Sequence, residues 1–211
     1  MLPLVFLPGA GGRAGFWRPV AERLADLGRA LRLAWPGFGD VPADSAIDSL
    51  DALYLWFLER LPEGRCHVVA QSMGGVLAAR LAIEHPERVA TLALCATSGG
   101  VDVNALGGAD WRPAYRAELP EVPDWFMVDR TDLTDRLGAI RAPTLVLYGD
   151  ADPICPAAVA MLLCGRIPHA RLEVVVGAAH DAAHERPDEV AAAIRRHVGL
   201  APAQRPLRSG Q

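Results

Sequence analysis

The chain has 211 residues, of which 51% are hydrophobic and 22% are charged, and its formal net charge is −4 at pH 7. These values are typical of one globular domain with its own core, and the negative charge argues against binding to nucleic acid or to an anionic membrane. All 21 basic residues are arginine, which excludes Schiff-base chemistry, a covalent pyridoxal lysine and the lysine of a phosphate-binding P-loop.

The cysteines and histidines show no pattern of a metal site. Cys66, Cys95, Cys155 and Cys164 lack CxxC spacing, and we expect them to be reduced, buried small hydrophobes. The six histidines form no HExxH pattern. The apolar start of the chain has no basic region or cleavage site of a signal peptide, and no apolar run is long enough to cross a membrane. The sequence therefore predicts a soluble, cytoplasmic protein.

The first predicted element is a strand over residues 2–7, which runs into a glycine-rich loop at 8–12. An unbroken apolar run fits a strand that is buried on both faces, as in a parallel sheet. The loop lets backbone N–H groups approach a ligand, but it does not match GxGxxG, so we disfavour dinucleotide binding. A helix over 16–27, a strand over 30–35 and a helix over 48–61 follow.

A strand over 66–71 ends abruptly at Ser72, and an Ala-rich helix over 73–84 starts at once. A serine at the apex of such a sharp turn has a strained backbone, and its hydroxyl is pushed out of the sheet edge. Only small residues fit two positions before and after it, where the chain has Ala70 and Gly74. The helix dipole behind the serine favours anionic groups.

The regular alternation of strands and helices breaks after a strand over 89–97. Residues 98–141 form a segment of short amphipathic pieces with several aromatic residues. Such aromatic residues fit a pocket lining and ordinary helical packing equally well, because the two look alike in sequence.

Two later strands, over 143–148 and 171–176, are each followed by polar residues that suit acid–base chemistry, and helices are predicted over 157–164 and 188–198. These candidates are Asp150, Asp152, His180 and His184. The whole order predicts an α/β fold with an open, parallel sheet of about six strands and helices on both faces. We expect a single domain over 1–198 and a flexible C-terminal tail over 199–211.

Three motifs carry a resemblance to the α/β-hydrolase family, in its serine-nucleophile esterase branch. The small-x-Ser-x-Gly pattern around Ser72 resembles the nucleophile elbow, residues 149–156 resemble the segment with the acid, and residues 177–187 resemble the segment with the histidine. The resemblance spans roughly residues 2–198. It implies a short cap at about 98–141, and a core whose first two strands have no counterpart in this chain. Pro8 stands where the family usually has a histidine.

Ser72, Asp152 and His180 occur in the family's order, each just past the carboxyl end of a predicted strand. In an open parallel sheet these ends share one rim, where ligands bind. We therefore predict a catalytic triad in which Ser72 attacks, His180 relays the proton and Asp152 orients His180. Asp150 and His184 are the competing acid and base. The motif spacing favours Asp152 over Asp150 as the acid and His180 over His184 as the base. The resemblance also implies that the N–H groups of Ala10 and Met73 form the oxyanion hole.

The resemblance implies a carboxylesterase that needs no cofactor or metal and acts on a small-molecule acyl substrate with a small or medium acyl group. We expect its pocket to be lined by aromatic residues, namely Trp17, Trp111, Trp125 and Phe126. The alternatives are an acyltransferase, thioesterase, lactonase or C–C hydrolase that uses the same triad, or a ligand-binding receptor of this fold. No nucleic acid or membrane partner is expected. The chain is expected to be a monomer, or a homodimer because strand 30–35 would be a sheet edge.

Overall fold

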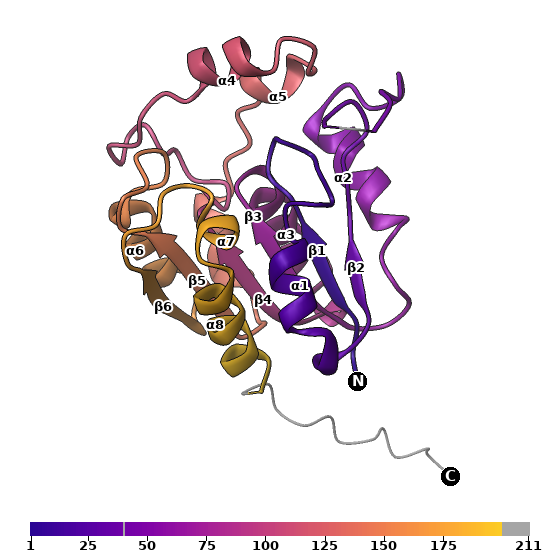
Figure 1. The fold of residues 1–211 in the computed structure, drawn as a ribbon, viewed down its shortest axis with the longest axis vertical. Coiled ribbons are helices and arrows are strands. Elements are labelled where there is room, and N and C mark those ends of the chain that lie inside the picture. The colour runs from indigo at the N-terminus through magenta and orange to yellow at the C-terminus, as the bar shows by residue number, and fades with distance from the viewer. Residues whose placement is uncertain (40, 200–211) are drawn as a thin grey trace.

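The computed structural model describes residues 1–39 and 41–199. One sheet contains six strands, all parallel, in the order β2-β1-β3-β4-β5-β6 (Figure 1). Their bounds are β1 (Leu4–Leu7), β2 (Ala30–Arg32), β3 (Cys66–Gln71), β4 (Val89–Cys95), β5 (Thr144–Gly149) and β6 (Ala170–Val175). The sheet is open, and the prediction of an α/β fold with six parallel strands is confirmed. Strand β2 is shorter than predicted, because the chain leaves the sheet after Arg32.

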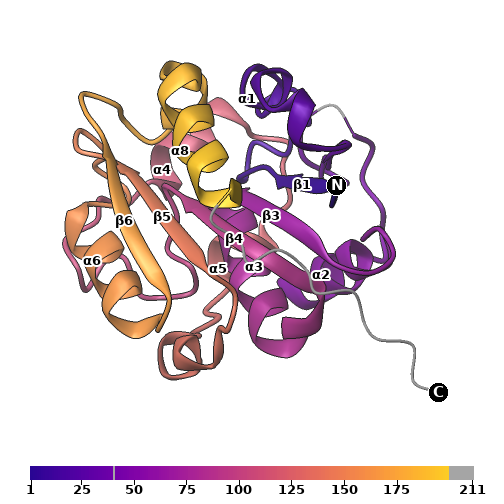
Figure 2. The same cartoon turned by 90° about the horizontal axis from the view of Figure 1, so that it is seen from below.

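Helices cover both faces of the sheet (Figure 2). On one face lie α1 (Arg18–Arg23), α7 (Ala182–Glu185) and α8 (Pro187–Gly199), and on the other lie α2 (Leu50–Leu58), α3 (Met73–Glu84) and α6 (Ala157–Arg166). Short 3-10 turns complete the order at η1 (Ala25–Leu27), η2 (Pro86–Arg88) and η3 (Thr134–Ala139). Two further helices, α4 (Arg112–Glu118) and α5 (Trp125–Val128), lie beyond the carboxyl ends of the strands (Figure 1).

The central strands β1, β3, β4 and β5 are mostly apolar because they lie between two hydrophobic cores, whereas the edge strands β2 and β6 are partly exposed. In β1, Val5 and Leu7 face the core under α2, α3 and α6, whereas Leu4 and Phe6 face the core under α1 and α8. Each of these side chains is at most 1% exposed. Burial of one such side chain stabilises the fold by about 1.5–3 kcal/mol, so the sheet is a rigid base for the loops at its rim.

Two histidines are buried away from that rim. His67 Nδ1 lies 2.8 Å from Thr91 Oγ1, and His197 Nε2 lies 3.0 Å from the carbonyl oxygen of Leu92 and 3.1 Å from that of Pro143. Because both bonds of His197 end on carbonyl oxygens, this nitrogen carries the proton and donates. Burial, with the charge of a nearby arginine, lowers the pKa of His197 to about 4. Both contacts are therefore structural.

Cys66, Cys95 and Cys155 are buried as expected, whereas Cys164 is partly exposed, which corrects the expectation for that residue; all four are free thiols. Within the described residues, no helix combines the length and the hydropathy that a membrane crossing requires. The tail expected over 199–211 lies outside the described residues except for Gly199, which is the last residue of α8.

Candidate active site

Ser72 stands at the junction of β3 and α3 with φ 51° and ψ −122°, a backbone conformation that residues other than glycine rarely adopt. Its N–H lies 3.2 Å from the carbonyl oxygens of both Cys95 and Ala96, and its own carbonyl oxygen accepts a hydrogen bond of 2.6 Å from Thr97 Oγ1. Contacts from the neighbouring strand thus hold the strained serine in place.

The turn at Ser72 requires small neighbours, as the sequence predicts. A side chain on Gly74 would collide with the carbonyl oxygens of Leu7 and Pro8. Helix α3 therefore begins directly against the loop that follows β1, and both loop and helix terminus lie beside the serine.

Three side chains from different elements form one hydrogen-bonded chain. His180 Nε2 lies 3.0 Å from Ser72 Oγ, and His180 Nδ1 lies 2.9 Å from Asp152 Oδ2. The His180 side chain is 19% exposed and that of Asp152 is fully shielded, so only the histidine end of this pair is open to an incoming molecule. The geometry is that of a serine, a base and a buried acid.

Backbone donors fix the acid. Asp152 Oδ1 accepts hydrogen bonds from the N–H groups of Ile154 at 2.8 Å and Cys155 at 3.1 Å. Burial alone would raise the pKa of Asp152, but the hydrogen bond and charge of His180, together with these two N–H groups, lower it below its ordinary value. Asp152 is therefore a carboxylate that accepts the proton-bearing Nδ1 of His180, which leaves Nε2 as a base toward Ser72.

The competing acid and base lie elsewhere. The carboxylate of Asp150 accepts a hydrogen bond from the N–H of Gly177 and supports the turn after β6. His184 is an exposed residue of α7. Neither residue takes part in the hydrogen-bonded chain at Ser72.

Of the two residues expected to donate to an oxyanion, Met73 follows Ser72 in the chain and Ala10 lies in the loop that packs on it. Met73 is the first residue of α3, so its N–H belongs to the first helical turn, where no intrahelical acceptor exists. Ala10 lies in the loop after β1, and this loop packs on the nucleophile, because a side chain on Gly9 would collide with Gln71 Oε1 and Ser72 Cβ.

A cavity of about 380 Å³ opens at Ser72. Its apolar wall includes Met73, Val76, Trp111 and Phe126, and the rings of the last two are stacked with centroids 5.4 Å apart. Its remaining lining is mostly polar and comes largely from the 98–141 segment, including Asp102, Asn104, Arg112, Asp129, Arg130 and Asp132. The cavity thus combines an apolar wall beside the serine with a charged rim.

Two of the four aromatic residues expected at the pocket do not line this cavity. Trp17 is fully buried on the opposite face of the sheet, beside Phe6, and donates from Nε1 to the carbonyl oxygen of Leu7 at 2.9 Å. Trp125 packs edge-on against Phe38, with centroids 5.6 Å apart. Both expectations are corrected, because these rings fill core space and leave the pocket wall to Trp111 and Phe126.

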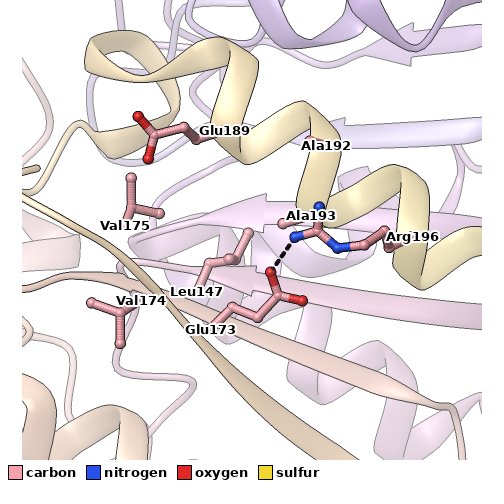
Figure 3. Close-up of a pocket in the computed structure, with 8 residues that line it drawn as sticks. All are labelled: Leu147, Glu173, Val174, Val175, Glu189, Ala192, Ala193 and Arg196. Atoms are coloured by element: carbon pink, nitrogen blue, oxygen red, sulfur yellow. Dashed lines mark hydrogen bonds and ion pairs between the residues drawn. The ribbon is translucent and has the colours of Figure 1, made fainter.

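A second cavity, of about 260 Å³, lies between β6 and α8 (Figure 3). Arg196 donates to Glu173 across it at 2.7 Å. None of the described residues that line it is a serine, a cysteine or a histidine. It therefore offers neither the nucleophile nor the base of a serine or cysteine hydrolase.

A metal could be sought at one group of side chains, since donor atoms of Asp152, Cys155 and His180 lie within 4.8 Å of one another. Two of these donors already bind each other, and burial raises the pKa of the Cys155 thiol far above its ordinary value. A cysteine binds a metal as its thiolate, so this set fits a serine-activating pair better than a metal centre.

Several supporting residues have no signal of their own in the sequence. Thr97 binds the carbonyl oxygen of Ser72, Gln71 Nε2 lies 3.4 Å from the carbonyl oxygen of His180, and Glu185 accepts from the N–H of Ala179 at 2.9 Å. Gln71 occupies a variable position of the small-x-Ser-x-Gly motif, and Glu185 belongs to the motif of residues 177–187. Its contact steadies the turn that carries His180.

Known proteins resemble this chain along most of its length. The family model described as alpha/beta hydrolase fold matches residues 3–134. The pimeloyl-[acyl-carrier protein] methyl ester esterase of Aeromonas hydrophila is 26% identical and covers 93% of this chain and 95% of its own length. The 2-hydroxy-6-oxononadienedioate/2-hydroxy-6-oxononatrienedioate hydrolase of Cupriavidus pinatubonensis is 28% identical, over 79% of this chain and 75% of its own.

A solved structure agrees with these sequence matches. The crystal structure of a hydrolase from Pseudomonas aeruginosa PA01 superposes with a TM-score of 0.77 at 25% identity, and the match covers 94% of this chain and 90% of that one.

Proposed function

Because the chain belongs to the α/β-hydrolase fold family and is a hydrolase, we propose that it is a carboxylesterase that forms an acyl-enzyme on Ser72. The observation that carries the proposal is the chain of hydrogen bonds from Ser72 Oγ through both ring nitrogens of His180 to Asp152. A serine hydroxyl is a weak nucleophile, and this arrangement is what activates it.

In the first half of the reaction, Ser72 Oγ attacks the ester carbonyl carbon while His180 Nε2 takes the hydroxyl proton. The carbonyl electron pair moves onto oxygen, where the N–H groups of Ala10 and Met73 stabilise the negative charge. The tetrahedral intermediate then collapses, the bond to the alcohol oxygen breaks, and His180 returns the proton to the departing alcohol.

In the second half, a water molecule takes the place of the alcohol. His180 removes a proton from this water, and the water oxygen attacks the acyl carbon. The second tetrahedral intermediate then breaks the bond between the acyl carbon and Ser72 Oγ, His180 returns the proton to Ser72, and the carboxylic acid leaves. Asp152 stays ionised throughout and balances the positive charge that forms on His180. Its lowered pKa supports this role.

The cavity supports an ester with a small or medium acyl group. A volume of about 380 Å³ lies near the lower end of the range that small-molecule sites span. The apolar wall at Met73, Trp111 and Phe126 suits the acyl chain, and the rim with Arg112 and Asp129 suits a polar end of the substrate.

The second candidate function is hydrolysis of a C–C bond next to a ketone, and the similarity to the hydrolase of Cupriavidus pinatubonensis favours it. The same serine and histidine would act, but the leaving group would be a carbon acid.

The test is a panel of p-nitrophenyl esters of graded acyl length, assayed together with a vinylogous 1,5-diketone that can undergo C–C cleavage. The esterase proposal predicts turnover of the esters, fastest for short or medium acyl groups, and slower turnover of the diketone. Turnover of the diketone without turnover of any ester would refute the esterase proposal and support C–C bond hydrolysis. A clear preference for long acyl groups would refute the inferred acyl length.

A further inference from the structure

Four successive carbonyl oxygens, from Leu7 at the end of β1 to Ala10 in the loop that follows, each accept a hydrogen bond, and three of the donors are aromatic side chains from outside the loop. The bonds are Trp17 Nε1 to Leu7 at 2.9 Å, Trp35 Nε1 to Pro8 at 3.0 Å, Gly12 N to Gly9 at 3.0 Å and Tyr115 Oη to Ala10 at 2.6 Å. The loop supplies one of these donors itself, from Gly12, and takes the other three from side chains elsewhere in the chain.

These bonds fix the direction of the Ala10 N–H. In a trans peptide the C=O and the N–H point in opposite directions, so a bound carbonyl also aims the amide of the same peptide unit. The unit that holds the Ala10 N–H is anchored by the bond from Gly12 to Gly9, and the unit on the other side of Ala10 is anchored by Tyr115. With both flanking peptide planes held, Ala10 has little freedom to turn.

Tyr115 differs from the other anchors because it comes from the 98–141 segment. It lies on α4, 105 residues from Ala10, and packs against Trp111 and Phe126 with ring centroids 5.6 Å and 5.1 Å away. Both of those rings line the cavity at Ser72, whereas Tyr115 does not. Burial raises the pKa of Tyr115 far above its ordinary value, so the hydroxyl keeps its proton and remains a donor.

We propose that Tyr115 is a positioning residue for the oxyanion hole. Through this residue, the packing of the 98–141 segment sets the direction of the Ala10 N–H. The inference rests on the proposed esterase function. When α4 is seated against the loop, the Tyr115 hydroxyl holds the Ala10 carbonyl and the amide points at the reacting oxygen. When that contact is lost, substrate still binds, but the developing charge loses an aligned donor.

The experiment removes one oxygen atom with Tyr115→Phe and compares it with Tyr54→Phe, which removes the hydroxyl of a buried tyrosine that likewise does not line the cavity. For each protein we would measure kcat and KM on the best ester, the inhibition constant of a trifluoromethyl ketone matched to it, and Tm. The ketone forms a tetrahedral adduct with the serine, and its affinity reports on the oxyanion hole.

We expect Tyr115→Phe to lower kcat about tenfold with KM unchanged, less than the 10²–10³-fold cost of losing a donor outright. The ketone affinity should fall by the same factor as kcat/KM, and Tyr54→Phe should retain both values.

Two results would overturn the inference. A Tyr115→Phe enzyme with kcat within twofold of the wild type would show that the hydroxyl does not align the hole. If Tyr115→Phe instead raised KM, left kcat unchanged and weakened substrate and ketone binding by the same factor, Tyr115 would only pack the pocket. Failure of the wild type to hydrolyse any ester or bind the ketone would instead refute the esterase function, and this inference with it.

Discussion

Asp152→Asn changes one atom of the carboxylate and is expected to lower kcat by about 10⁴-fold, which corresponds to about 5 kcal/mol of transition-state stabilisation. The backbone N–H groups of Ile154 and Cys155 donate to Oδ1 and keep the amide oxygen on their side. The amide NH₂ then faces His180 Nδ1, which accepts only when it carries no proton. His180 is thereby forced to carry its proton on Nε2, where it cannot take one from Ser72.

The assay is steady-state hydrolysis of the best ester by the wild type and the variant, with Tm measured to confirm folding. Asp150→Asn is the matched control, since its carboxylate supports the turn at Gly177 and stands outside the hydrogen-bonded chain at Ser72, and we expect it to retain kcat within a few fold. A crippled Asp150→Asn beside an active Asp152→Asn would refute the assignment of the acid. An Asp152→Asn enzyme within tenfold of the wild type would refute the role of the histidine tautomer.

Three further changes test other parts of the account. Because the pKa of His197 is about 4 in the folded state and about 6.5 in an unfolded chain, the unfolded state binds more protons between these values. Stability should therefore fall by up to about 3 kcal/mol as pH drops from 6.5 to 4; a Tm with the same pH dependence in His197→Gln would contradict this. Trp17→Phe removes the indole N–H that donates to the Leu7 carbonyl and leaves space in the core, so it should cost about 1–3 kcal/mol in urea unfolding with KM unchanged; a raised KM without lost stability would restore Trp17 to the pocket. Gly74→Val should destabilise by about 1–3 kcal/mol because its side chain meets the Pro8 carbonyl, and an unchanged unfolding midpoint would show that the turn has room.

The central strands of the sheet were predictable because they are buried on both faces and therefore appear as mostly apolar runs, whereas the edge strands β2 and β6 are partly exposed and carry charged residues. Strand β4, buried at every position from Val89 to Cys95, is an example. The positions of Ser72, Asp152 and His180 were predictable for a related reason, since residues just past the carboxyl ends of parallel strands meet at one rim. The structure brings the three side chains together, and their catalytic roles are what the experiments test.

The aromatic residues could not be assigned in the same way. Helical periodicity shows that Trp17 faces inward, but not that its helix packs on the sheet face away from the cavity. The contact between Tyr115 and Ala10 had no sequence signal, because it joins two loosely patterned segments 105 residues apart. The length of edge strand β2 was overestimated, since strand propensity does not show where pairing with the neighbouring strand ends.

The most direct test of the central claim is labelling with a fluorophosphonate probe, read by intact mass on the wild type and on Ser72→Ala. A single adduct on the wild type that is lost in the variant is the predicted result, because only an activated serine attacks phosphorus at a useful rate. An unlabelled but folded wild type, or an equal adduct on Ser72→Ala, would contradict the claim that Ser72 is the nucleophile of a working hydrolase.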